Sequence, residues 1–121
     1  MAEETVPEVP AASPPISIDD FARLQLRVGT IRSAEAHPKA DRLVVLQVDL
    51  GEAQDRQIVA GIRLHVDFAE LPGRQIVVVA NLAPVKLRGV ESQGMLLAAT
   101  DADGLTLVAP GRVVAPGSTV R

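Results

Sequence analysis

The sequence predicts an all-β fold: a barrel of five short strands with one or two short helices and a C-terminal extension. Apolar residues alternate with polar ones or form short runs, and both patterns are typical of strands. Gly, Pro, Asn and Asp interrupt these runs at short intervals, as expected for tight turns. The chain has 121 residues, of which 47% are hydrophobic, so we expect one domain built around one core.

The N-terminal segment, residues 1–15, is predicted to be a disordered tail or linker, and the domain is predicted to span residues 16–121. The tail is rich in Pro, Ala and Glu and has few bulky apolar side chains. It therefore cannot bury enough surface to offset the entropy lost on ordering.

The domain is expected to begin with a short helix and a half-buried strand. Ser17 is placed to cap the helix, with Asp20 three residues later. In residues 24–30 apolar and polar side chains then alternate, which predicts a strand with one buried face. Gly29 is expected to mark a bulge in this strand.

The remaining elements suit a small closed barrel. Further strands are predicted over residues 43–50, 56–60, 75–80, 95–99 and 105–108. The last two form a hairpin, and a short helix is expected near residues 67–70. The strand at 75–80 is apolar throughout and is expected to be buried on both faces. This spacing suits the OB-fold, although periodicity alone leaves a β-sandwich open.

Charge is distributed unevenly along the chain. The net charge of −3 arises from 12 basic and 15 acidic residues. Glu3, Glu4 and Glu8 lie in the tail, which has no basic residue, so residues 16–121 are neutral. A neutral domain can bind a polyanion only if its basic side chains gather on one face.

Composition narrows the classes of function. The chain has no cysteine, which excludes disulfides, thiolate zinc sites and cysteine nucleophiles. The acidic start and the lack of a long apolar run predict a cytoplasmic protein without a membrane partner. His37 and His65 lack metal-ligand spacing, and no nucleophile elbow or Walker loop occurs. We therefore expect a non-catalytic domain with no metal, no cofactor and no small-molecule substrate.

Two polar segments are candidates for binding a polyanion. In residues 81–95, Lys86 and Arg88 are two apart, so in extended backbone they would point the same way toward neighbouring phosphates. In residues 37–42, Lys39 and Arg42 lie on the loop that borders the oligonucleotide face of an OB-fold. Chemistry alone leaves a second reading open: solvated loops, with surface ion pairs of little energetic consequence.

Aromatic content indicates what kind of nucleic acid to expect. Barrels that hold single strands stack bases on aromatic side chains, and only Phe21 and Phe68 are aromatic here. Both are expected in the core. RNA would then be recognised through its backbone and folded shape.

Five blocks of sequence, taken in order, resemble a known family. They are residues 18–21, 26–29, 40–43, 58–62 and 79–95. Over residues 16–121 they resemble the tRNA-binding domain of the EMAPII type, found at the C-terminus of many methionyl-tRNA synthetases and in free-standing tRNA-binding proteins. The resemblance implies an OB-fold whose C-terminal extension builds a homodimer and whose surface recognises the shape of tRNA.

Carried over by position, the resemblance implies a tRNA face. Its residues would be Lys39, Arg42, Asn81, Lys86, Arg88, Ser92, Gly94 and Met95. The chain itself would supply no chemistry, whether as a domain of methionyl-tRNA synthetase or as a free protein. Two alternatives stay open: an export chaperone like CsaA, which binds unfolded polypeptide, and a module that only dimerises.

Overall fold

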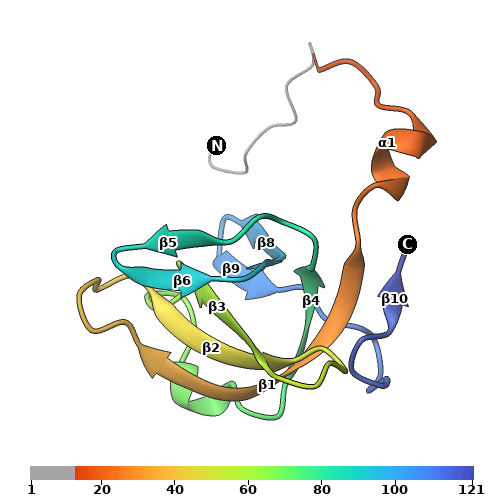
Figure 1. Cartoon of the computed structure of the whole chain (residues 1–121). Helices are drawn as coiled ribbons and strands as arrows, with labels where there is room; N and C mark the ends of the chain where they lie inside the picture. The colour runs from red at the N-terminus through yellow and green to blue at the C-terminus, as the bar shows by residue number, and fades with distance from the viewer. Residues whose placement is uncertain (1–12) are drawn as a thin grey trace.

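The computed structural model describes residues 13–121, which form an almost entirely β structure (Figure 1). The predicted tail lies outside the described residues as far as residue 12. The strands are β1 (Leu26–Ala36), β2 (Val44–Asp49), β3 (Arg56–Ala60), β4 (Gln75–Val79), β5 (Val85–Leu87), β6 (Val90–Ser92), β7 (Met95–Leu96), β8 (Ala98–Asp101), β9 (Gly104–Leu107) and β10 (Thr119–Val120). A short helix, α1 (Ile18–Ala22), precedes them, and a 3-10 turn, η1 (Phe68–Glu70), lies between β3 and β4.

The principal sheet is antiparallel and curls into a nearly closed five-strand barrel. Its strand order is β3-β2-β1-β4-β7, and β10 pairs with β1 outside this path. This confirms the predicted OB-type barrel, with η1 as the short helix between the third and fourth strands. It also confirms the C-terminal extension, which returns the chain to the start of β1 (Figure 1).

The long strand β1 serves both halves of the barrel. Its first part pairs with β4 and its second part with β2, and the register shifts between Ile31 and Ser33. The predicted bulge at Gly29 is therefore wrong by a few residues. Gly29 has a different role: a Cβ atom there would lie 2.5 Å from Val48 Cγ1 and 2.9 Å from Leu50 Cδ2, so only glycine allows this close packing.

The core fills the barrel interior. Its largest fully buried side chains are Ile31, Val44, Leu46, Val48, Leu50, Ile58, Leu71, Ile76 and Val78. Four successive residues of β4, from Ile76 to Val79, are buried, which confirms that this strand is covered on both faces. Each fully buried aliphatic side chain contributes about 1.5–3 kcal/mol to folding.

The helix α1 has the predicted cap but no buried residue. Ser17 Oγ accepts a hydrogen bond from Asp20 N at 3.1 Å, which confirms the N-cap. The expectation that Phe21 lies in the core is wrong, because this helix stands outside the barrel on the side where β10 runs (Figure 1). Neither helical segment of residues 13–121 has the length and apolar content that a bilayer crossing requires.

Two hairpins extend the barrel, and only one of them was predicted. The β8–β9 hairpin forms at the expected turn, where Asp101 Oδ1 accepts from Asp103 N at 2.8 Å. No strand is predicted in the polar segment that begins at residue 81, yet it contains the β5–β6 hairpin, with Lys86 opposite Glu91. This second hairpin carries half of the predicted cations.

Candidate nucleic-acid interface

The β5–β6 hairpin has a two-residue turn at Arg88 and Gly89. Their φ angles are +52° and +87°, which is the left-handed backbone of a type I′ turn. Asn and Gly are the usual residues there, because a larger side chain costs about 1–2 kcal/mol in this region. The expectation that Lys86 and Arg88 project together from extended backbone is therefore wrong, since Arg88 sits in the turn itself.

The loop between β1 and β2 meets this turn. Arg88 Nη2 donates to Lys39 O at 3.3 Å, and His37 Nε2 lies 2.9 Å from Leu87 O. Lys39 N donates to His37 Nδ1 at 2.9 Å. The loop that carries Lys39 and Arg42 thus packs on the hairpin that carries Lys86 and Arg88, so the structure brings the four predicted cations onto adjoining loops.

These four cations are exposed and have no acidic partner in the described region. Within residues 13–121, no carboxylate oxygen lies within 4.0 Å of Lys39, Arg42, Lys86 or Arg88. Asp41, on the same loop, therefore pairs with neither Lys39 nor Arg42, and the surface ion pairs of the second interpretation are not observed there. Their positive charge remains available to a ligand.

Two arginines on the barrel strands, Arg32 and Arg56, are paired with acids. Arg32 pairs with Asp49 at 3.0 Å and Asp55 at 3.1 Å. Arg56 pairs with Glu52 at 2.8 Å. Among the described residues, other arginines outside the candidate loops, such as Arg74 and Arg112, also lack an acidic partner, so the candidate cations differ from these by lying on two loops in contact. Two acids belong to the candidate loops: the exposed Asp41, between Lys39 and Arg42, and Glu91, directly opposite Lys86 in the ladder.

Ser92 and Gly94 face the protein interior. Ser92 is 2% exposed; its Oγ accepts from Val59 N at 2.9 Å and donates to Gly94 O at 2.9 Å. A Cβ atom on Gly94 would lie 3.2 Å from both Val78 Cγ1 and Val79 O. These two residues therefore set the path of the chain between β6 and β7, and the Ser92 hydroxyl is not presented to solvent.

Asn81 is exposed but its side chain is hydrogen-bonded to the protein itself, and Met95 lies at the surface too. Asn81 Oδ1 accepts from Gln25 N at 2.8 Å, and its Nδ2 donates to Arg23 O at 2.7 Å. The side chain thereby fixes the end of β4 to the segment that leads into β1. Met95 is 49% exposed, and Val85 on the hairpin is 54% exposed, so apolar surface lies among the polar groups.

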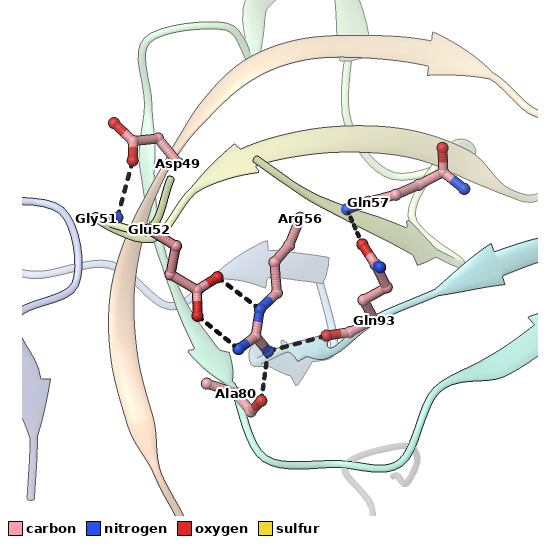
Figure 2. Close-up of polar contacts among 7 residues, drawn as sticks. All are labelled: Asp49, Gly51, Glu52, Arg56, Gln57, Ala80 and Gln93. Atoms are coloured by element: carbon pink, nitrogen blue, oxygen red, sulfur yellow. Dashed lines mark hydrogen bonds and ion pairs between the residues drawn. The ribbon is translucent and has the colours of Figure 1, made fainter. Parts of the chain in front are cut away.

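Sequence reasoning missed the residue that anchors this segment, Arg56 on β3. Its Nη1 donates to Ala80 O and, at 3.1 Å, to Gln93 O, so one guanidinium holds both ends of the segment that contains the hairpin (Figure 2). Glu52 accepts from Arg56 Nε and Nη2 at 2.9 and 2.8 Å. These hydrogen bonds lower the pKa of the Glu52 carboxyl below its ordinary value of 4.5.

Side chains complete the closure of the barrel next to Arg56. Gln93 N donates to Gln57 O at 2.7 Å, and Gln57 N donates to Gln93 Oε1 at 2.9 Å (Figure 2). Ser92 Oγ accepts from the N–H of Val59, also on β3. Side-chain oxygens thus replace strand carbonyls along this edge, a substitution that no periodic pattern signals.

The fold and this surface together define a small OB-type β-barrel domain whose two adjoining loops carry exposed cations. Among residues 13–121 no group of three His, Asp or Glu side chains is arranged to hold a metal. Residues 26–119 match the family described as "Putative tRNA binding domain". The chain belongs to this tRNA-binding domain family.

Individual relatives agree with this assignment. The chain is 51% identical over 106 residues to the methionine–tRNA ligase of Thermococcus kodakarensis; the match covers 88% of this chain and 14% of the ligase. It thus spans a small fraction of that enzyme. The structure resembles a methionyl-tRNA-synthetase-related protein from Pyrococcus horikoshii, with a TM-score of 0.83 and 36% identity, covering 90% of this chain and 100% of the other.

A chaperone shares the fold as well. The CsaA chaperone of Bacillus anthracis matches with a TM-score of 0.79 and 29% identity, covering 89% of this chain and all of that one.

The family match over residues 26–119 and the identity to a methionine–tRNA ligase confirm the sequence resemblance to the tRNA-binding domain family.

Proposed function

We propose that this domain binds folded tRNA by placing exposed cations against its phosphate backbone. The observation that carries the proposal is the contact between Arg88 and Lys39, which joins two loops whose cations have no acidic partner among the described residues. Arginine and lysine at adjoining positions suit the phosphates of a folded polyanion. The domain adds affinity and supplies no chemistry.

Recognition is by shape more than by sequence. Phe21 and Phe68 are the chain's two aromatic residues. Phe21 lies on α1. Phe68 packs against the core, and Cζ of Arg63 lies over its ring, 5.9 Å from the ring centroid. The candidate loops therefore offer no aromatic platform for stacking bases. Contacts to phosphate and ribose remain, and they report the contour of the RNA.

The domain acts as a homodimer through the face that contains α1 and β10. A hollow of about 400 Å³ lies there, lined by Ile18, Phe21, Ala22, Leu24, Gln25, Leu26, Arg27, Thr119 and Arg121. Ile18 and Leu24 are 78% and 43% exposed, so a second copy would cover apolar surface. Dimerisation doubles the phosphate contacts available to one tRNA.

Sedimentation tests the dimer directly. Ile18→Asp should shift the protein toward monomer, because a charge would be placed in the apolar contact. Leu64→Asp makes a matched apolar-to-acid change at a residue that is 68% exposed outside this face, and it should leave the oligomer unchanged. A wild-type monomer at every concentration would exclude this part of the proposal.

The relatives support a biological setting for the proposal. The 51% identity to a methionine–tRNA ligase supports a role beside that enzyme, either as one of its domains or as a separate auxiliary protein. The resemblance to CsaA at 29% identity supports the second candidate, binding of unfolded polypeptide. Exposed Val85 and Met95 are the apolar groups that a peptide would contact.

A competition assay separates the two candidates. Labelled tRNA is titrated with protein at low salt, and unfolded polypeptide is then added as competitor. The tRNA proposal predicts saturable binding that excess polypeptide does not displace. Binding of polypeptide without binding of tRNA would favour the chaperone, and binding of neither, with the dimer retained, would leave only a dimerisation module.

A further inference from the structure

The buried side chain of His37 connects the two loops of the candidate interface. His37 is 3% exposed and directly follows β1, where its own N–H donates to Leu43 O at 3.0 Å and closes the loop. Its ring reaches Lys39 of the same loop and Leu87 of the hairpin. Both ring nitrogens are used, so the ring bridges two segments that are 50 residues apart.

The partners determine which ring nitrogen carries the proton. A backbone N–H can only donate, so Nδ1 accepts from Lys39 N at 2.9 Å. A carbonyl can only accept, so Nε2 carries hydrogen and donates to Leu87 O at 2.9 Å. The neutral ring with hydrogen on Nε2 therefore satisfies both loops at once.

Lys39 is held from both sides of its backbone. Its N–H is taken by His37 and its carbonyl oxygen by Arg88 Nη2 at 3.3 Å. Leu87, which His37 also holds, directly precedes Arg88 in the chain. The ring and the guanidinium thus link the backbones of the two loops at Lys39 and at the Leu87–Arg88 turn.

We propose that His37 is a positioning residue that makes Lys39 and Arg88 act as one tRNA-binding unit. The inference rests on the proposed function and deepens it: His37 touches no RNA, yet it sets how far apart two phosphate contacts lie. If His37 only filled the core, its loss would lower stability and leave the two cations independent. A positioning role instead makes their contributions to affinity depend on each other.

A double-mutant cycle on tRNA affinity tests the coupling. The dissociation constant is measured for wild type, Lys39→Ala, Arg88→Ala and the double variant, and again for all four with His37→Asn. The Asn side chain keeps an acceptor near the position of Nδ1 but cannot reach Leu87. With His37 present, the loss of tRNA affinity in the double variant should differ by roughly threefold to tenfold from the product of the two single losses. With His37→Asn, it should equal that product.

His37→Gln is the matched control. Its amide nitrogen can reach Leu87 O, so this variant should recover part of the affinity and part of the coupling that His37→Asn loses. Amide hydrogen exchange reports the link without RNA: with His37→Asn, the amides of residues 87–90 should exchange at least severalfold faster, while those of β4 are unchanged.

The outcomes are distinct. Additive losses in the wild-type background, or equal coupling in the wild-type and His37→Asn backgrounds with both proteins normally folded, would overturn the proposal. If His37→Asn does not fold, the wild-type cycle and the Gln variant still decide, because amide exchange shows whether His37→Gln keeps the bridge. Full coupling in His37→Gln with the bridge lost, or no coupling with the bridge kept, would contradict the inference. Absence of tRNA binding by the wild-type protein would defeat the proposed function itself, and the exchange data would then show only whether the bridge exists.

Discussion

Arg88 and Lys39 are 49 residues apart in the sequence, yet the guanidinium of Arg88 donates to the backbone oxygen of Lys39 at 3.3 Å. Arg88 holds this contact from a left-handed backbone with φ of +52°. Unfavourable backbone that persists in a structure often marks a functional position. At this position Arg88 carries a backbone cost that Asn or Gly would avoid, and the proposed role of its charge in binding would account for that cost.

Replacing Arg88 by Asn should separate stability from affinity. The Asn side chain tolerates the left-handed region, which should raise the free energy of unfolding by up to about 1 kcal/mol. Loss of the exposed hydrogen bond to Lys39 O, which is long at 3.3 Å, should offset only part of this gain. Affinity for tRNA should fall, because one cation is lost. Urea denaturation and tRNA titration measure the two effects. Arg88→Lys is the control: it keeps both the charge and the backbone strain, so the free energy of unfolding and the tRNA affinity should change less than in Arg88→Asn. A lower free energy of unfolding for Arg88→Asn would contradict this account.

Removing the acid opposite Lys86 should strengthen binding. Glu91→Gln deletes a negative charge from the candidate face, and the affinity for tRNA should rise about twofold at low salt, an effect that fades as salt screens the charge. Glu70→Gln, in η1, provides the same change of net charge away from the hairpin. Equal gains from both variants would mean that only total charge matters.

Loss of the Ser92 hydroxyl should destabilise the fold. Ser92→Ala leaves the N–H of Val59 without its partner in a buried position, which should lower the free energy of unfolding by about 1–3 kcal/mol. Thr106→Ala removes an exposed hydroxyl from β9 and should cost well under that amount. Denaturant titration checks both, and a neutral Ser92→Ala would show that another acceptor serves Val59.

Acid should weaken the anchor on Arg56. The pKa of Glu52 is lowered in the folded protein, chiefly by hydrogen bonds from Arg56. Its stabilising effect is therefore fully present above the ordinary value of 4.5 and is lost as the pH falls through the lower folded value. The difference in unfolding free energy between wild type and Glu52→Gln should shrink over that acid range; a difference independent of pH would exclude the carboxylate as its source.

Local sequence patterns predicted the elements that have a typical turn sequence or a long apolar run. The β8–β9 turn ends in Asp103–Gly104, a sequence typical of turns, and the apolar run at β4 indicated a strand buried on both faces. The β5–β6 hairpin escaped prediction because its strands are three residues each and its turn begins with Arg88. Nothing in the sequence distinguishes that arginine from one on a solvated loop.

The candidate site was predicted only in part, because some of its residues are signalled by local sequence and others depend on distant contacts. Charge and loop position pointed to Lys39, Arg42 and Lys86, which the structure leaves exposed and without an acidic partner among the described residues. The burial of Ser92 and the bridging role of His37 depend on contacts across dozens of residues. Such contacts are set by the closure of the barrel, which a single sequence does not reveal.

The salt dependence of tRNA affinity tests the central claim most directly. Each phosphate contact contributes about 0.7–0.9 to the slope of log K against log salt. Lys86→Ala with Arg88→Ala should therefore weaken binding and reduce the slope by up to about two, while the matched pair Arg74→Ala and Arg112→Ala, two exposed arginines outside the candidate loops, should leave it unchanged. An unaltered slope in the first double variant, or an equal reduction in the second, would contradict the proposed interface.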